Sequence, residues 1–471
     1  MDDQNLPAQM GITMRERRLT EGLDRYIPMI LRDGALYNGD LDRFLLDLPL
    51  NGLRSPHSLR AYGYDITIWV RFLEAARGKS VWTADRSDVA AFHRARRHGE
   101  AGTRISAASW NRSVAALDKL YQWAKLDGLV ESCPFTHRDV WRRGHGAGRA
   151  RVVAHNQAYE RAAKRSDVRF IALEDYGVFR DVGLRGLTAD GMERPGARDR
   201  NGARNALFAE LLVTTGLRLE EASFLLAVEI AGLIPGASRG KQAWFALPAA
   251  LTKGDRGRRI LVPQRVLRQI AAYIAVERAH AAVNFKTRSG WRSIEQPIFI
   301  QNPILGAIRV PLRDGGAIQI DALTPDERGR LVICGNDGVP LAPAALWLTE
   351  IGLPVQPNSW EVAFARACRR CTDAGFPMRV SPHQLRHTFA VHMLAMLIQS
   401  RLRDAACEAT SPGMEGYRRL LGDPLQQVQR LLGHASLTTT YLYLDHIVDR
   451  ADTIDAAVEE LLALIPKARA S

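Results

Sequence analysis

The sequence predicts a mainly α-helical protein with a small antiparallel β-sheet. Apolar residues recur at helical spacing through residues 55–126, which predicts a compact all-helical domain. Residues 243–263 form two short strand-like runs around a turn, which is the pattern of a hairpin. Helical patterning returns over residues 266–281 and again from Ser359. These observations favour one all-helical domain followed by a larger, mainly helical one.

The helices of the first domain have recognisable starts. Pro56 lies close to the first turn of a helix that begins at Ser55, and Asp85 precedes a second helix. A third helix is expected over residues 106–126. Aromatic residues fall on the apolar stripes, so we expect them in the core rather than exposed as stacking platforms. The stripes contain Leu59, Tyr62, Ile66, Trp69, Phe72, Leu73, Val89, Phe92, Trp110, Val114, Leu117, Leu120, Tyr121 and Trp123.

The larger domain mixes helices with short strands. A helix through Leu212 is expected to turn at Gly216 and resume to Leu226. In the hairpin, Lys253 lies at the turn between strands 243–247 and 259–263. Further strand-like runs occupy residues 297–300, 317–320 and 331–333.

Composition divides the chain into five segments. The run Arg142–Arg151 is rich in glycine, basic and without periodicity, which is typical of a flexible linker. Apolar residues between 454 and 465 predict an amphipathic C-terminal helix. The segments are 1–50, a leader of mixed helical pattern and unknown role; 51–140, the helical domain; 141–200, the linker and the start of the next domain; 201–450, the larger domain; and 451–471, the C-terminal helix.

Charge indicates a polyanionic partner. Lys and Arg number 64 against 51 Asp and Glu, a formal net charge of 64 − 51 = +13, and the pI is about 9.8. Nucleic acid is the commonest partner of so basic a chain, although membrane surfaces also attract basic proteins. No stretch approaches the roughly 18 consecutive apolar residues of a membrane-spanning helix. The acidic N-terminus is unlike a secretory signal, so we expect a cytoplasmic protein without membrane contact.

The cysteines predict reduced thiols. Their number, five, is odd, which is typical of an intracellular chain without a disulfide framework. Cys368 and Cys371 form a single CxxC pair without a second pair to complete four zinc ligands. A buried pair on one helical face is the interpretation we favour over a metal or redox site.

The last third of the chain carries chemically suggestive motifs. They are His383-Gln384-Leu385-Arg386-His387, Leu432-Gly433-His434, Tyr443 nine residues further on, and, upstream, Thr215-Gly216-Leu217-Arg218-Leu219-Glu220-Glu221. Arginine is always charged and can hold two phosphoryl oxygens at once. Histidine and lysine can transfer protons, and tyrosine, with an ordinary pKa of about 10, becomes a nucleophile where cations stabilise its phenolate. This set suits phosphodiester cleavage without a metal.

The order of these four segments resembles the tyrosine recombinase (phage integrase) family. The resemblance covers residues 54–465 and implies a SAM-like helical core-binding domain and a catalytic domain that form a C-shaped clamp around duplex DNA. It implies no cofactor and no metal.

The resemblance also assigns roles to individual residues. Two arginines, Arg218 and Arg386, would hold the scissile phosphate, with Glu221 orienting the site. Lys253 would be the general acid to the leaving 5′ oxygen, His383 an acid/base assistant to the tyrosine, and His434 a phosphate contact. Tyr443 would be the nucleophile, and His387 a supporting residue.

Two alternatives stay open at these positions. Tyr441 is a rival nucleophile two residues before Tyr443. His383 and His387 at i, i+4, followed by His392, have the spacing of zinc ligands. The glutamate of that zinc motif is absent, however, and an arginine between the histidines would repel a dication.

Arginines and one lysine on the polar faces of the helical domain are candidate phosphate contacts. A solvated charged face is the alternative for each of them taken singly. The candidates are Arg60, Arg94, Arg96, Arg97, Arg104, Arg112 and Lys119.

The resemblance therefore predicts a site-specific recombinase of a mobile element that works through a 3′-phosphotyrosine and a Holliday junction. Expected partners are double-stranded DNA, three further copies in a homotetramer and accessory DNA-bending proteins. The rivals are a type IB topoisomerase and a catalytically silent DNA-binding regulator. Spacings longer than usual in the family predict insertions near 285–331 and 399–422. The C-terminal helix would dock in cis or on a neighbouring protomer.

Overall fold

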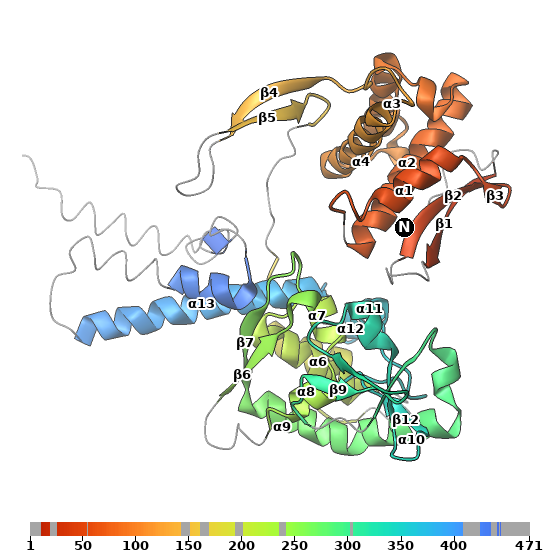
Figure 1. The fold of residues 1–471 in the computed structure, drawn as a ribbon. Helices are drawn as coiled ribbons and strands as arrows, with labels where there is room; N and C mark the ends of the chain where they lie inside the picture. Colours follow the sequence, from red (N-terminus) through yellow and green to blue (C-terminus); the bar gives the residue numbers. More distant parts are fainter. Residues whose placement is uncertain are drawn as a thin grey trace, which may run out of the picture. The chain divides into compact units, whose positions relative to one another are not determined.

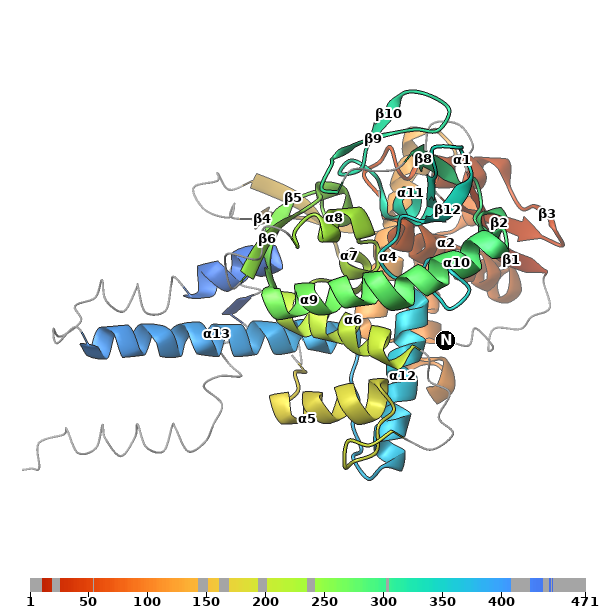
Figure 2. The same cartoon turned by 90° about the horizontal axis from the view of Figure 1, so that it is seen from below.

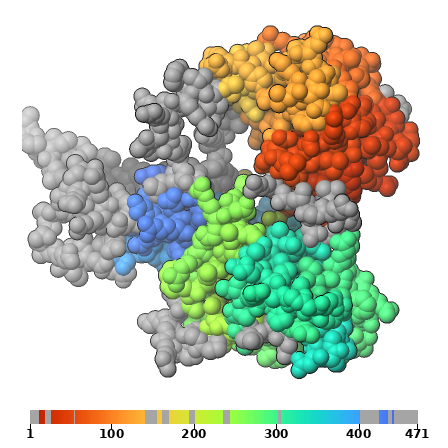
Figure 3. All heavy atoms as spheres, viewed as in Figure 1, coloured from red at the N-terminus to blue at the C-terminus, as the bar shows by residue number. Residues whose placement is uncertain are grey.

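The chain divides into two compact units, Met1–Arg165 (unit 1) and Ser166–Ser471 (unit 2). Within them the computed structural model describes residues 11–18, 26–53, 55–142, 151–160, 169–193, 201–234, 242–301, 305–407, 424–434, 440–441 and 443. Figure 1 colours unit 1 red to yellow and unit 2 yellow-green to blue, and Figure 3 shows the same residues as spheres. No helix within these ranges is long and apolar enough to cross a membrane.

Unit 1 is a helical bundle with a small antiparallel sheet and a hairpin (Figure 1). The sheet has the order β1-β2-β3, and β4 pairs with β5. The elements are β1 (Ile12–Arg18), β2 (Tyr26–Arg32), β3 (Ala35–Leu36), α1 (Gly39–Asp47), α2 (Pro56–Phe72), α3 (Arg86–His98), α4 (Ala107–Leu126), β4 (His137–Arg142) and β5 (Arg151–Asn156).

The three predicted helices of this unit are confirmed. Asp85 accepts the backbone N–H groups of Ser87 and Asp88, and Asp88 accepts that of Asp85, which is a reciprocal cap. Ser106 caps α4 in the same position of its helix. Side-chain acceptors at both starts thus satisfy N–H groups that the helices leave unpaired.

Aromatic residues form the core of unit 1, as the apolar stripes predict. Trp69 and Tyr121 are fully buried, and Nε1 of Trp69 donates to the Tyr121 hydroxyl at 2.8 Å. That hydroxyl donates to the Val81 carbonyl at 2.7 Å, so the polar atoms of both rings are paired. Trp110, buried to 1% exposure, donates to the Ala158 carbonyl.

The expectation of a separate helical leader over residues 1–50 is wrong. β1 and β2 pair along their whole length, and Ile12, Ile27 and Ile30 lie in the same core cluster as Trp69. α1 adds Phe44 and Leu45 to that cluster. Local periodicity misses the strands because a strand is stabilised by its cross-strand and packing partners, which are distant in sequence.

The expected inter-domain linker also has a different place. Arg142 and Arg151 are the last pair of the β4–β5 hairpin, so the segment that they bound connects two strands inside unit 1. Residues 143–150 themselves lie outside the described residues. The boundary between the units falls after Arg165.

Unit 2 is mainly helical with several small sheets (Figures 1 and 2). Its elements are α5 (Leu173–Val178), α6 (Gly202–Thr215), α7 (Leu219–Ser223), α8 (Ala227–Ala231), β6 (Gln242–Leu247), β7 (Arg258–Pro263), α9 (Gln264–Tyr273), α10 (Ala279–Thr287), β8 (Ile298–Gln301), β9 (Arg309–Pro311), β10 (Ala317–Gln319), α11 (Pro325–Arg330), β11 (Leu331–Cys334), β12 (Pro340–Pro343), α12 (Pro357–Asp373) and α13 (Pro382–Cys407). Residues 424–432, 440, 441 and 443 are also helical.

The predicted hairpin is confirmed as the antiparallel pair β6–β7, and the mainly helical class with small antiparallel sheets is confirmed as well. One strand pair departs from that class, because β8 lies parallel to β11. Cys368 and Cys371 are free thiols on α12, with Cys371 fully buried. Cys371 therefore agrees with the favoured interpretation of a buried helical pair, whereas Cys368 is only half-buried.

An aromatic cluster holds the centre of unit 2. Phe208 of α6 stacks on Trp360 of α12 with ring centroids 3.7 Å apart and planes 3° from parallel. Trp347 packs on both rings, and its Nε1 donates to the Ala222 carbonyl of α7 at 2.9 Å. Figure 2 shows α9 running alongside α6. This core fixes α6 and α7, whose junction carries Arg218.

The two expected insertions fall in different surroundings. Residues 285–331 contain β8, β9, β10 and α11 and share a second cluster with Leu226 and Val228. Near 399–422, α13 continues to Cys407, and residues 408–423 lie outside the described residues. The predicted C-terminal helix at 451–471 lies outside them too. That these regions are insertions stays a prediction.

Replacing Gly216 by alanine should destabilise unit 2 by at least about 2 kcal/mol. Gly216 ends α6 in the left-handed region (φ 65°), where a side chain costs about 1–2 kcal/mol. A Cβ there would also clash with Phe389 of α13. Gly254→Ala is the matched control, because φ is +84° but nothing lies within 4 Å. Urea unfolding of both variants measures the difference, and equal losses would contradict the clash.

Candidate active site

The first half of the site is built at the start of α7. Glu221 accepts the backbone N–H of Arg218 at 2.8 Å and its Nη1 at 2.7 Å. The carboxylate is 1% exposed, whereas the Arg218 side chain is 31% exposed. Glu221 thus holds the guanidinium in place while leaving it open to a ligand.

Arg258, at the start of β7, is a site residue that the motif analysis missed. Its Nη1 and Nη2 donate to the two oxygens of Glu221 at 2.8 and 2.5 Å, and its Nε donates to the Leu431 carbonyl at 3.0 Å. The alternation of β7 places Arg258 on the same face as the buried Ile260 and Val262, and this was the signal available in the sequence.

Burial by itself would raise the pKa of Glu221. The hydrogen bonds and positive charge of Arg258, followed by the charge of Arg218, outweigh it and hold that pKa below its ordinary value. Glu221 is therefore ionised at neutral pH.

Arg386 connects the motifs through backbone carbonyls. It is 3% exposed, and its guanidinium donates to the Gly216 carbonyl and, at 2.6 Å, to the Leu432 carbonyl. Burial, followed by the nearby charge of Arg218, lowers the pKa of Arg386 to about 9. A buried cation with a second cation nearby is stabilised by a bound anion.

His434 packs beside Tyr443. The two rings are 17° from parallel with centroids 6.0 Å apart, and Nδ1 of His434 lies 3.1 Å from the Thr440 hydroxyl. Burial first, then Arg386 and Arg218, lower the pKa of His434 to about 3. The imidazole is therefore neutral at pH 7.

The hydroxyl of Tyr443 lies 3.0 Å from Nδ1 of His387. Nε2 of His387 lies in turn 2.9 Å from Nε2 of His383, one turn earlier on α13. The side chain that contacts the tyrosine is therefore His387, whereas the sequence assigned His383 to it. Tyr443 is 2% exposed and Tyr441 is 51% exposed, so only the former turns into this cluster.

Lys253 lies on the exposed connection between β6 and β7. Among the described residues no hydrogen bond or ion pair joins it to the cluster. Its role as general acid stays a prediction.

The candidate DNA-binding residues of unit 1 differ in their partners and in their exposure. Three are paired with carboxylates: Arg60 with Glu16, Arg97 with Glu160, and Arg112 with Asp65. Arg104 donates to the Gly99 carbonyl and Lys119 to the Asn51 carbonyl, while Arg94 is exposed and Arg96 half-buried. Arg60 and Arg112 keep 44% and 50% of their side chains exposed despite these pairs. Their contact with DNA stays a prediction.

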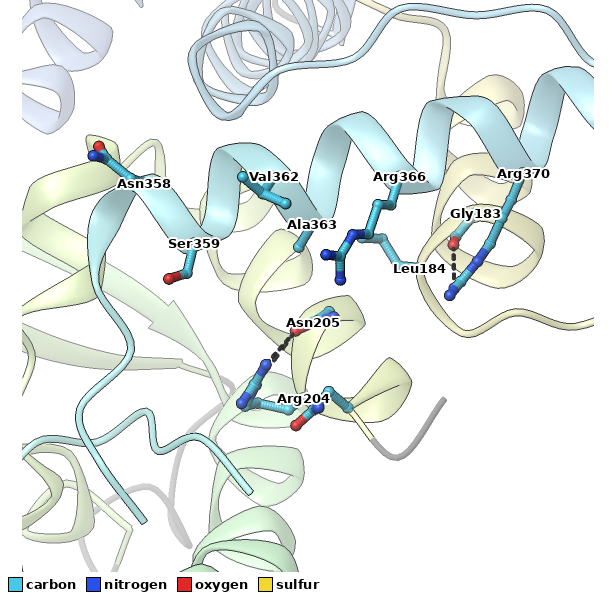
Figure 4. A pocket seen from close by; sticks show the side chains of 11 residues that line it. Gly183, Leu184, Arg204, Asn205, Asn358, Ser359, Val362, Ala363, Arg366 and Arg370 are labelled. Atoms are coloured by element: carbon cyan, nitrogen blue, oxygen red, sulfur yellow. Dashed lines mark hydrogen bonds between the residues drawn. The ribbon is translucent and has the colours of Figure 1, made fainter. Parts of the chain in front are cut away.

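A recess of about 400 Å³ lies between α6 and α12, apart from the residues of the cluster. Figure 4 shows Arg366 pointing into it, with Arg204 bonded to Asn205 and Arg370 to the Gly183 carbonyl. None of the predicted site residues lines it.

The chain is similar in sequence to known recombinases. Residues 41–128 match the model of the phage integrase N-terminal SAM-like domain. The tyrosine recombinase XerC of Pelobacter propionicus is 25% identical over 408 residues, covering 86% of this chain and 90% of its own. XerD of Corynebacterium glutamicum is 34% identical over 99 residues, covering 21% and 23%. The chain is therefore similar to the tyrosine recombinases, and to XerC over most of its length.

Among solved structures, the Tn1549 transposon integrase in complex with a circular intermediate DNA matches with a TM-score of 0.44. It is 13% identical, and the match covers 89% of this chain and 98% of that one.

Replacing Arg258 by methionine should destabilise unit 2 by about 3 kcal/mol, because Glu221 would stay buried with one cation fewer. The exposed neighbour Arg259, which lies over Trp244, provides the matched control variant Arg259→Met. Urea unfolding of both variants, with Glu221→Gln and the double variant, measures the coupling. Equal effects of the two methionine substitutions would contradict a role in the site.

The pKa of His434 predicts a contribution to acid sensitivity. An unfolded histidine has a pKa of about 6.5, so the unfolded chain binds the proton first. Stability from neutral His434 is present above about pH 6.5 and is lost as the pH falls towards about 3. The melting temperature should therefore fall less steeply from pH 7 to pH 5 in His434→Gln than in the wild type. Parallel curves would contradict this.

Proposed function

We propose that Tyr443 attacks a DNA phosphodiester, giving a 3′-phosphotyrosine and a free 5′ hydroxyl, without metal or ATP. The 5′ hydroxyl of a partner strand then reverses the step, so that strands exchange through a Holliday junction in a homotetramer on paired sites. The proposed role is the movement of a mobile element, with accessory proteins bending the DNA. The observation that carries the proposal is the gathering of Tyr443 with His387, His434 and Arg386 in one cluster.

The electrostatics of the cluster support phosphate as the missing ligand. Arg386 is buried, and the guanidinium of Arg218 lies close enough to lower its pKa. Two neighbouring cations repel each other, and an anion bound between them offsets this repulsion. A scissile phosphate held by both would place its non-bridging oxygens on fixed donors, which stabilise the charge of the transition state.

The nucleophile starts as a phenol. Burial raises the pKa of Tyr443, and the charges of Arg386 and Arg218 only partly oppose this. At neutral pH the hydroxyl must therefore lose its proton to a base during attack. Neutral His434 would donate a hydrogen bond to a phosphate oxygen from Nε2, with Nδ1 directed at Thr440. Lys253 would protonate the leaving 5′ oxygen.

Covalent trapping tests the proposal. On a suicide duplex built from short direct repeats that flank the gene, the wild type should form a covalent DNA adduct. Tyr443→Phe should abolish the adduct, since the attacking oxygen is gone, and Tyr441→Phe should form it at the wild-type rate. Both are measured as retarded bands on denaturing gels.

Other outcomes would separate the rivals. An adduct that persists in Tyr443→Phe and is lost in Tyr441→Phe would move the nucleophile. DNA binding by the wild type without any adduct would leave a silent regulator. Relaxation of supercoiled plasmids lacking paired sites, without exchanged products, would indicate a type IB topoisomerase.

A further inference from the structure

His387 occupies the space between the tyrosine and the exposed edge of the site. Its Nδ1 lies 3.0 Å from the Tyr443 hydroxyl and its Nε2 lies 2.9 Å from Nε2 of His383. The two histidines are one turn apart on α13, with ring centroids 4.3 Å apart and planes at 71°. Tyr443, His387 and His383 therefore form a continuous hydrogen-bonded chain from a buried hydroxyl to an exposed imidazole.

The chain of bonds restricts where the protons lie. Two neutral imidazoles that face each other through Nε2 share one proton between those atoms. If the tyrosine hydroxyl donates to Nδ1 of His387, the proton of His387 lies on Nε2 and is donated to His383. In that tautomer His387 presents a lone pair to the phenol and has a partner to take its own proton.

We propose that His387 is the base that accepts the proton of Tyr443, and that it passes a proton on to His383. This rests on the proposed function of Tyr443 as the nucleophile. As the Tyr443 oxygen bonds to phosphorus, its proton moves to Nδ1 of His387, and the proton on Nε2 moves to Nε2 of His383. The bond from phosphorus to the 5′ oxygen breaks, and that oxygen takes a proton from the general acid.

The surroundings favour release of the proton at the far end. His383 is exposed at the edge of the site, so it can exchange with water. Burial of the rest of its ring, then Arg386 and Arg218, lower the pKa of His383, so its imidazolium is short-lived. His434 is placed differently, because its ring lies 17° from parallel to the Tyr443 ring with centroids 6.0 Å apart, and its Nδ1 lies 3.1 Å from the Thr440 hydroxyl.

The charged and titratable groups of the site that contains His387 come from several elements. α13 supplies His383 and Arg386, and the last segment supplies His434 and Tyr443. Arg218 and Glu221 come from the start of α7, and Arg258 from β7. A bound phosphate would offset the positive charge of Arg386, Arg218 and Arg258 during reaction.

His387→Asn is the variant that separates proton transfer from positioning. The Asn oxygen can still accept a hydrogen bond from the Tyr443 hydroxyl, but an amide cannot accept the proton. We expect the initial rate of adduct formation on the suicide duplex to fall by about 10²-fold or more. His392→Asn, further along α13, is the matched control and should cleave at the wild-type rate. Gel shifts and thermal melts check that both variants fold and bind DNA.

The pH dependence of the cleavage rate distinguishes proton transfer from a structural role, because loss of a structural role would not change the shape of the profile. Without a base, the reaction depends on the fraction of phenolate, so the rate of His387→Asn should rise about tenfold per pH unit below the pKa of Tyr443. The wild-type rate should level off once His387 is neutral. His383→Asn should lose less than His387→Asn, since the contact between His387 and the hydroxyl remains.

A substrate with sulfur in place of the bridging 5′ oxygen separates the base from the acid. A thiolate leaves without a proton, so this substrate should restore Lys253→Ala if that lysine is the general acid. It should leave His387→Asn slow, because the attacking hydroxyl still needs its base.

Three results would overturn the relay. These are wild-type or faster cleavage by His387→Asn, a pH profile parallel to that of the wild type, or a larger loss in His383→Asn than in His387→Asn. If the wild type forms no Tyr443-dependent adduct, the proposed function fails instead, and the relay fails with it. The wild-type lane therefore distinguishes the two failures.

Discussion

The buried carboxylate of Glu221 is the constraint on which the rest of the site depends. A charge that is 1% exposed must be compensated, and Arg218 and Arg258 compensate it from two directions. Arg258 also bonds to the Leu431 carbonyl, so one ion-pair network ties together α7, β7 and the helix at 424–432. Three segments that are far apart in the sequence thereby take fixed positions.

Arg386 adds to the arrangement by donating hydrogen bonds to the carbonyls of Gly216 and Leu432. Its charge has backbone dipoles as partners, and Arg218 lies close by. The free enzyme therefore keeps positive charge that is incompletely neutralised where a phosphate would bind. In the proposed reaction this charge would bind the phosphate and stabilise the transition state, at some cost in the stability of the free protein.

Much of the fold was predictable from local signals. Caps at Asp85 and Ser106, apolar stripes and the hairpin turn are features of neighbouring residues, so their meaning does not depend on the rest of the chain. The strands β1 and β2 were not predicted, and the segment predicted as an inter-domain linker instead connects the strands of the β4–β5 hairpin. Strand pairing is decided by partners that local periodicity does not contain.

The sequence by itself predicted the resemblance to the tyrosine recombinases, the main helices and the candidate site residues, because these signals lie in short motifs and in local periodicity. Only the tertiary structure decided which side chains meet. It brought Arg258 to Glu221 and turned Tyr443 inwards and Tyr441 outwards. It also set His387 between His383 and the tyrosine hydroxyl. A hydrogen bond depends on distance and direction in space, and spacing along a helix fixes only which residues share its face.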